Sequence, residues 1–98
     1  MRRLYVLIKT LPKKEHIVAR DLCDCIYYHD AEVRCEVLSP GRFLIYTHME
    51  GLERCVNMRY FSKVIKGLEY FDEISLERPR CSNCVVVEVG GKFFVRWV

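Results

Sequence analysis

Leu4-Tyr5-Val6-Leu7-Ile8-Lys9-Thr10, followed directly by Leu11-Pro12, is the stretch that decides the fold. Seven residues rich in β-branched and aromatic types are typical of a central strand. Proline suits the first turn of a helix, and an amphipathic segment begins immediately after it. The chain is therefore expected to open with a strand that passes directly into a packing helix.

The next two elements are predicted to be a helix and a half-buried strand. Residues 13–28 are expected to be helical because Val18, Leu22 and Ile26 recur at a spacing of four residues. Residues 31–38 alternate between apolar and charged side chains. This alternation predicts a strand with one buried face, at the edge of a sheet.

A tight turn and three further elements follow. Ser39-Pro40-Gly41 predicts a turn, because proline presets φ at one central position and glycine accepts a positive φ at the next. Residues 42–47 then form a strand antiparallel to the preceding one. Thr47 and Glu50 have the spacing of a capping box, which predicts the start of a second helix. Residues 63–71 are expected to form a fourth strand.

The order β-α-β-β-α-β predicts an α+β, ferredoxin-like fold. Its four-stranded antiparallel sheet carries both helices on one face and has the first and third strands in the centre. Residues 85–89 and 92–98 flank Gly90-Gly91, which predicts a C-terminal β-hairpin. We expect a ferredoxin-like domain at residues 1–78 and the hairpin at residues 79–98, packed on or extending the same domain.

The open face of the predicted sheet holds the main candidate binding residues. Period-two alternation places Tyr5 and Lys9 of the first strand beside Arg42 and Tyr46 of the third. RNA-recognition sheets use aromatic rings flanked by cations to stack bases and hold phosphates. The alternative is that the hairpin or a second subunit buries this face, because the apolar hairpin strands need a partner surface.

Four other basic residues extend this candidate interface: Lys63, Lys66, Arg78 and Arg80. They are consistent with dispersed positive charge that contacts the phosphate backbone of a nucleic acid. Solvated surface charge is the ordinary explanation for such residues. The net charge is +3, from 16 basic and 13 acidic residues. This balance permits contact with nucleic acid or an acidic protein without arguing for it.

Six cysteines are an unusual number for so short a chain. Cys81 and Cys84 have the spacing of a zinc half-site, but the sequence lacks a second pair of ligands to complete it. A Cys81–Cys84 disulfide, a bridge from one of them to another cysteine, and free thiols are the alternatives. Intracellular disulfides are a feature of hyperthermophiles, so a thermophilic host or its virus is the expected source.

Patterns for catalysis, cofactors and membranes are missing from the sequence. The three histidines are scattered, and neither a glycine-rich phosphate loop nor a nucleophile motif is present. No apolar run approaches the ~18 residues of a membrane span, and the N-terminus lacks a signal peptide. We therefore expect a cytoplasmic protein without enzymatic activity, cofactor or membrane contact.

Three stretches carry a resemblance to a known family: residues 5–10 with Glu15 and Val18, residues 40–45, and residues 61–67. They are similar to the first strand and helix, the Pro-Gly strand opening and the closing strand of the N-terminal (NGN) domain of NusG-type transcription elongation factors, particularly the archaeal kind. The resemblance implies a partner in RNA polymerase or another RNA or transcription complex, and no enzymatic activity.

Two other families resemble parts of the chain. The first strand with residues 10–15 looks like the amino-acid-binding effector module of the Lrp/AsnC regulators, which dimerises through its sheet. A Pro-Gly strand start also occurs in the ferredoxin-like domain that precedes THUMP in tRNA-modification adaptors. We expect a small binding module that acts on transcription or RNA machinery through protein and nucleic-acid contacts. The alternatives are a ligand-sensing or homodimerising module, and a viral protein that blocks a host complex.

Overall fold

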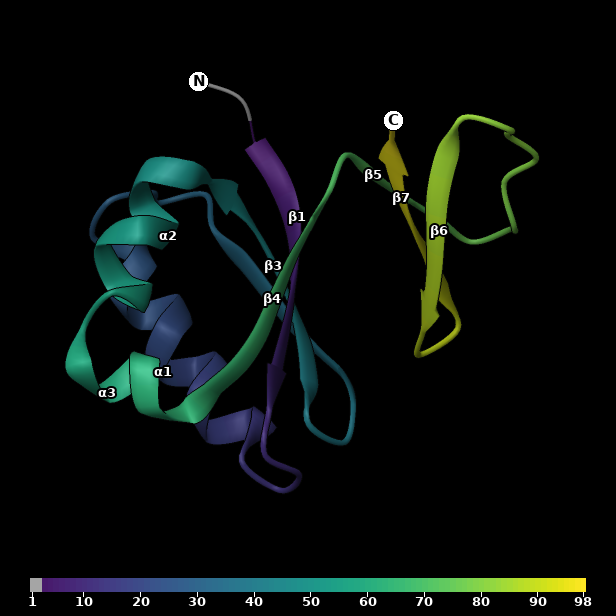
Figure 1. The fold of residues 1–98 in the computed structure, drawn as a ribbon. Helices are drawn as coiled ribbons and strands as arrows, with labels where there is room; N and C mark the ends of the chain where they lie inside the picture. The colour runs from purple at the N-terminus through teal and green to yellow at the C-terminus, as the bar shows by residue number, and fades with distance from the viewer. Residues whose placement is uncertain (1–2) are drawn as a thin grey trace.

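The computed structural model describes residues 3–98, whose elements follow one another as β1 (Arg3–Thr10), α1 (Glu15–Tyr27), β2 (Arg34–Ser39), β3 (Arg42–His48), α2 (Met49–Val56), α3 (Arg59–Val64), β4 (Ile65–Phe71), β5 (Glu73–Ser75), β6 (Cys84–Val89) and β7 (Lys92–Trp97). Within this range the strands form a four-stranded sheet, β2-β3-β1-β4, and a three-stranded sheet, β5-β7-β6. We call the first the helix-covered sheet and the second the C-terminal sheet. Figure 1 shows the helices on one side of the helix-covered sheet and the C-terminal sheet on the other.

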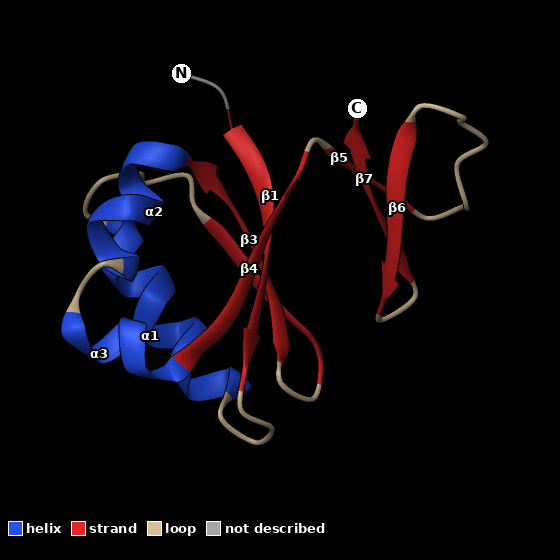
Figure 2. Ribbon diagram, in the orientation of Figure 1, coloured by secondary structure: helices blue, strands red, loops and turns tan. Residues whose placement is uncertain are grey.

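The helix-covered sheet confirms the predicted α+β, ferredoxin-like fold. Its strands pair antiparallel, with β1 and β3 in the centre and β2 at an edge. The helices pack on a single face, as Figure 2 shows in blue. The main core lies between the helices and this face of the sheet. It consists of Val6, Ile8, Val18, Ala19, Leu22, Ile26, Phe43, Ile45, Leu52, Cys55 and Phe61.

Gly41 takes the conformation that the sequence predicts for the β2–β3 turn. Its φ is +76°, and a Cβ there would lie 2.9 Å from the carbonyl oxygen of Thr10. Both features favour glycine, which has no Cβ and tolerates positive φ. The Gly41 N–H donates to the buried Glu15 carboxylate at 3.1 Å. The turn is therefore anchored to the first turn of α1.

The predicted capping box at the start of α2 is wrong. The N-cap is His48, whose Nδ1 accepts a hydrogen bond from the Gly51 N–H at 3.2 Å. The Thr47 hydroxyl is already engaged elsewhere, because it donates to the Asp30 carboxylate at 2.8 Å. Glu50 instead forms an exposed ion pair with Arg54.

The fourth strand starts later than the sequence predicts. Residues 59–64 form the short helix α3, which buries Phe61 in the main core, and β4 begins only at Ile65. The β-branched residues Val64 and Ile65 made residues 63–71 look like one strand. Lys63 therefore lies on a helix, not on the sheet.

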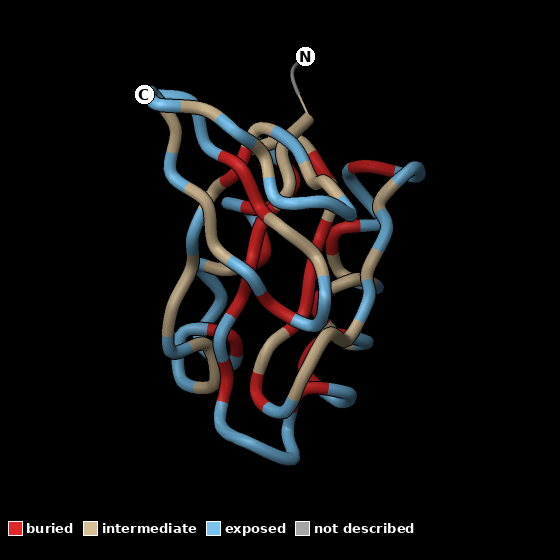
Figure 3. The backbone as a smooth tube through the Cα atoms, turned by 90° about the vertical axis from the view of Figure 1, so that its right-hand side faces the viewer, coloured by how far each residue is buried: buried red, intermediate tan, exposed pale blue. Residues whose placement is uncertain are grey.

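The C-terminal sheet packs against the face of the helix-covered sheet that the helices leave open. A second core lies between the two sheets and consists of Leu7, Leu44, Phe71, Val89 and Phe94. Figure 3, which views the molecule from the side of the C-terminal sheet, shows buried, intermediate and exposed residues alternating along the chain. The predicted hairpin is confirmed, with Gly90 and Gly91 both at positive φ, but β5 adds a third strand that was not predicted.

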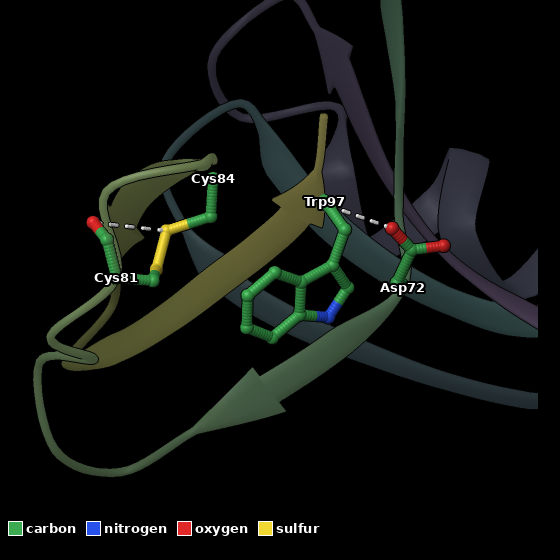
Figure 4. The surroundings of a disulfide bond; sticks show 4 residues. All are labelled: Asp72, Cys81, Cys84 and Trp97. Atoms are coloured by element: carbon green, nitrogen blue, oxygen red, sulfur yellow. Dashed lines mark hydrogen bonds between the residues drawn. A yellow bond between two sulfur atoms is a disulfide. The ribbon is translucent and has the colours of Figure 1, made fainter.

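The cysteines of residues 3–98 form three disulfides. Cys23–Cys35 joins α1 to β2, Cys25–Cys55 joins α1 to α2, and Cys81–Cys84 closes a short loop before β6. Figure 4 shows the Cys81–Cys84 bridge beside the end of β7. Beside this bridge, the backbone N–H of Trp97 donates to the Asp72 carboxylate at 2.9 Å. Because the six cysteines are paired in disulfides, the alternative of free thiols is wrong.

Candidate nucleic-acid interface

Tyr5 and Tyr46 form an aromatic pair on the central strands. They face each other in the β1–β3 register, with ring centroids 4.6 Å apart and ring planes tilted by 33°. The Arg3 guanidinium carbon lies 5.7 Å from the Tyr46 ring centroid, a cation–π distance. Both tyrosines remain partly exposed. This end of the predicted binding face is therefore not sealed by the C-terminal sheet.

The tyrosine pair lines a pocket between the two sheets. We call it the tyrosine pocket; its volume is about 460 Å³, and its lining residues are Tyr5, Arg34, Cys35, Glu36, Leu44, Tyr46, Ile74 and Lys92. The helix-covered sheet supplies the aromatic wall, and β5 and β7 supply the opposite side through Ile74 and Lys92. A concave site with apolar walls and a few charged groups is the usual form of a small-ligand site.

Charged side chains rim the tyrosine pocket. Glu36 on β2 and Lys92 on β7 form an ion pair that links the two sheets across it. Arg34 is exposed, and no ion pair joins it to another residue of the range 3–98. It faces Tyr46 in the β2–β3 register, so both side chains lie on the same side of the sheet. The rim therefore carries one positive charge in excess.

The C-terminal sheet divides the predicted open face into two ends. The central row, Leu7 with Leu44, is buried beneath Val89 and Phe94. Tyr5 and Tyr46 lie at one end of this row. Lys9 and Arg42, also register partners, lie at the other end and line a smaller pocket of about 160 Å³. The hairpin therefore buries the central row of this face, as the alternative in the sequence analysis had it, and leaves its two ends accessible.

The other predicted basic residues lie away from the tyrosine pocket. Lys63 and Lys66 are exposed at the α3–β4 junction, where the Lys66 ammonium donates to the Lys63 carbonyl at 3.1 Å. Arg78 lies 5.1 Å from the Phe93 ring centroid, and Arg80 is exposed on the same loop. The structure brings none of these four side chains into the lining of the pocket.

Arg34, Glu36 and Lys92 are the charged pocket residues that the sequence analysis missed. The strand alternation of residues 31–38 already separates Arg34 and Glu36 from the apolar face of β2. Combined with the β2–β3 turn at Gly41, it places both side chains on the tyrosine side of the sheet. Lys92 left no such signal, because its position depends on how the hairpin docks.

A metal centre and a membrane-spanning helix are both missing from the described residues. Between residues 3 and 98, no three His, Cys, Asp or Glu side chains are arranged to hold a metal ion. Cys81 and Cys84 bond to each other and so present no thiolate ligands. No helix in the same range is long and apolar enough to cross a membrane.

These features define an α+β domain of ferredoxin-like topology with a C-terminal sheet docked on its second face. Residues 5–69 match the family described as "Protein of unknown function (DUF3195) N-terminal domain", and the chain belongs to that family. The matched segment contains Tyr5, Arg34, Glu36 and Tyr46 of the tyrosine pocket. The end of β4, residues 70–71, and the whole C-terminal sheet, including Lys92, lie beyond it. None of the curated proteins matches the chain.

Proposed function

We propose that this protein is a non-enzymatic module that binds single-stranded nucleic acid through the tyrosine pocket and acts within transcription or RNA machinery. The observation that carries the proposal is the Tyr5–Tyr46 pair, held on adjacent central strands and partly exposed in a pocket with a cationic rim. Aromatic side chains on central strands are the stacking platforms of single-strand binders, and every base offers a face to stack on them.

The dimensions of the tyrosine pocket favour an unpaired nucleotide over a duplex. A volume of about 460 Å³ lies within the range of small-molecule sites and suits one or two unstacked bases. The C-terminal sheet stands over the middle of the face, so a duplex has no flat surface on which to lie. A base at the end of a single strand, or one splayed out of a loop, can enter between the sheets.

The charges around the tyrosine pocket support contacts with phosphate. Arg34 is exposed and free to swing toward a backbone phosphate, and a guanidinium fork matches phosphate geometry. Lys9 and Arg42 offer a second cationic position at the far end of the same strands, about 13 Å away at strand spacing. A single-stranded nucleic acid that contacts both positions would have several of its phosphates neutralised by these cations. Binding is therefore expected to weaken as the salt concentration rises.

The direct test is fluorescence anisotropy with a labelled single-stranded oligoribonucleotide. Base stacking is worth about 1–3 kcal/mol per base, so Tyr5→Ala and Tyr46→Ala should each weaken binding about 5- to 150-fold. Tyr28→Ala is the matched control, because Tyr28 is 87% exposed beyond the end of α1 and remote from the pocket. No binding by the unaltered protein, or equal weakening by all three variants, would contradict the proposal.

A second arm measures the charge contribution. The logarithm of the binding constant should fall linearly with the logarithm of the salt concentration, with a slope of about 0.7 per phosphate contacted. Arg34→Ala should make that slope shallower, whereas Arg20→Ala, which removes an exposed arginine on α1, should leave it unchanged. Salt-independent binding would argue against phosphate contacts.

The concave form of the tyrosine pocket and its charged rim also favour one alternative, a ligand-sensing module. Glu36 and Lys92 could hold the ammonium and carboxylate groups of an amino acid. Binding of such a ligand would raise the melting temperature in proportion to the logarithm of its concentration. A thermal shift with amino acids, together with the absence of RNA binding, would favour this alternative. Capture of an RNA polymerase in a pull-down from host extract would instead favour the first proposal.

A further inference from the structure

Strand β6 forms an exposed edge of the C-terminal sheet. Within residues 3–98 it has β7 on one side and no strand on the other. Its six residues, Cys84 to Val89, include four valines and no proline, and Val85 is 38% exposed. Figure 1 shows β6 on the outer side of the C-terminal sheet, away from the helices. A long apolar edge strand of this kind is a template for pairing with another chain.

The other sheet edges carry more features that discourage such pairing than β6 does. Strand β2 presents the exposed charges of Arg34 and Glu36 and has a register shift near its end. Strand β4 presents the exposed charges of Lys66 and Glu69, and its pairing with β1 is also shifted. Strand β5 has only three residues. By contrast, the β6–β7 register is regular throughout, and Glu88 is the only charged residue on β6.

The hydrogen-bonding groups that β6 leaves unused can be assigned from its register. A two-residue hairpin closes on a hydrogen-bonded pair, here Val89 with Lys92, and such pairs recur at every second residue. The Asn83 carbonyl accepts from the Val98 N–H at 3.0 Å, which fits this series. The N–H and C=O groups of Cys84, Val86 and Glu88 therefore point outward, away from β7.

We propose that the protein forms a two-fold symmetric dimer in which β6 pairs antiparallel with β6 of a second copy, centred on Val86. This register places Val86 opposite Val86 of the second copy and sets Cys84 opposite Glu88, so the outward groups of each strand meet those of the other. Val85 then faces Val87, and no like charges stand opposite each other. The pairing uses none of the residues that line the tyrosine pocket, so it is independent of the proposed function.

The test is the molar mass in solution, measured by light scattering on a sizing column over a range of protein concentrations. The unaltered protein should reach twice the 11.7 kDa chain mass. Val86→Pro removes an N–H that points outward, not toward β7, so it should shift the equilibrium to monomer at least tenfold. Val86→Thr is the matched control, because it keeps both the N–H and the strand propensity.

A second variant covers the case in which Val86→Pro fails to fold. Val85→Lys places a cation on a half-exposed position of the monomer but opposite an apolar side chain in the dimer. It should also raise the dissociation constant of the dimer at least tenfold while leaving the circular dichroism spectrum unchanged. An unaltered protein that stays monomeric at every concentration would overturn the proposal. So would a dimer that persists in Val85→Lys or in folded Val86→Pro.

Discussion

At the scale of single residues, Asp30 connects more of the helix-covered sheet than any other polar side chain named above. Its carboxylate accepts two hydrogen bonds from the Arg3 guanidinium at 2.6 and 2.7 Å. It also accepts from the Thr47 hydroxyl at 2.8 Å and from the Glu32 N–H at 3.1 Å. The side chain is almost completely buried. One carboxylate therefore ties the loop before β2 to both central strands.

Removing this carboxylate should destabilise the fold. Asp30→Ala leaves the half-buried Arg3 guanidinium and the buried Thr47 hydroxyl without their partner, at a cost of about 2 kcal/mol. Asp24→Ala, which removes an exposed carboxylate from α1, should change the free energy of unfolding by no more than about 0.5 kcal/mol. Urea denaturation at neutral pH measures both changes. Equal stabilities for the two variants would show that the network contributes little.

The same network makes stability depend on pH. The hydrogen bonds from Arg3, helped by Thr47 and Glu32, hold the pKa of Asp30 well below its usual range, although burial opposes them. Because this pKa is lower in the folded state, the stabilisation is complete above the unfolded pKa of about 4 and is lost as the pH falls further. The difference in unfolding free energy between the unaltered protein and Asp30→Asn should therefore shrink from pH 7 to pH 3. A constant difference would contradict this linkage.

Thr47 illustrates what the sequence could and could not predict about single residues. Its spacing from Glu50 is that of a capping box, and a helix does begin beside it. The use of its hydroxyl by Asp30 depends on a contact 17 residues away in the chain, which local spacing does not record. By contrast, the positive φ of Gly41 was predictable, because the turn that demands it is entirely local.

At the scale of elements, α1 is the helix most strongly tied to its neighbours. Cys23 and Cys25 lie two positions apart and point to different sides, as their spacing predicts. One bonds to Cys35 on β2, and the other bonds to Cys55 on α2. The helix is thus fixed covalently both to the edge of its sheet and to the neighbouring helix.

The disulfides should differ in what they contribute to stability. Cys25–Cys55 spans 30 residues and Cys81–Cys84 spans three. In the chain-entropy model, the first bridge stabilises the folded state by about 3.5 kcal/mol and the second by about 2 kcal/mol. Replacing both cysteines of each bridge by alanine should therefore lower the melting temperature more for the first pair than for the second. Thermal unfolding under non-reducing conditions measures the difference. A larger loss from the second pair would show that the short loop has a greater role than its length suggests.

Element boundaries were predictable where turn residues or a regular spacing of apolar residues marks them. The β6–β7 hairpin and the β2–β3 turn follow from Gly-Gly and Pro-Gly. The α3–β4 junction has neither glycine nor proline, and the same β-branched residues serve the end of the helix and the start of the strand. Strand β5 is too short to show alternation and exists because β7 pairs with it.

At the scale of the whole molecule, the helix-covered sheet lies between two layers. The helices bury one face of it, and the C-terminal sheet buries the middle of the other. Phe94 is fully buried in the second core and contacts Phe71, with ring centroids 5.4 Å apart. This second core determines how wide the tyrosine pocket opens, because it sets the distance between the two sheets.

The second core should be essential for stability. Phe94→Ala removes a fully buried aromatic side chain and should cost about 3–5 kcal/mol. Trp97→Ala removes a larger side chain that is 48% exposed, and should cost clearly less. Equilibrium denaturation of the two variants provides the comparison. A smaller loss for Phe94→Ala than for Trp97→Ala would contradict the docking of the C-terminal sheet.

The architecture of the helix-covered sheet was predictable from strand order and turn chemistry. The docking of the C-terminal sheet was not, because the apolar hairpin could equally cover the open face, extend an edge or meet another molecule. Its apolar residues showed only that some surface had to receive it. This choice also determines the candidate site: Tyr5 and Tyr46 were predicted, whereas the wall that makes their surface a pocket depends on long-range packing.

The tyrosine pocket is tested most directly by an NMR titration of the isotope-labelled protein with a single-stranded oligoribonucleotide. If the pocket binds the strand, amide and aromatic signals of Tyr5, Arg34, Tyr46 and Lys92 should shift in a saturable manner. Signals of Tyr28, on the helical side of the molecule, should stay in place. Shifts confined to the helices, or no saturable shift at all, would contradict the proposed binding site.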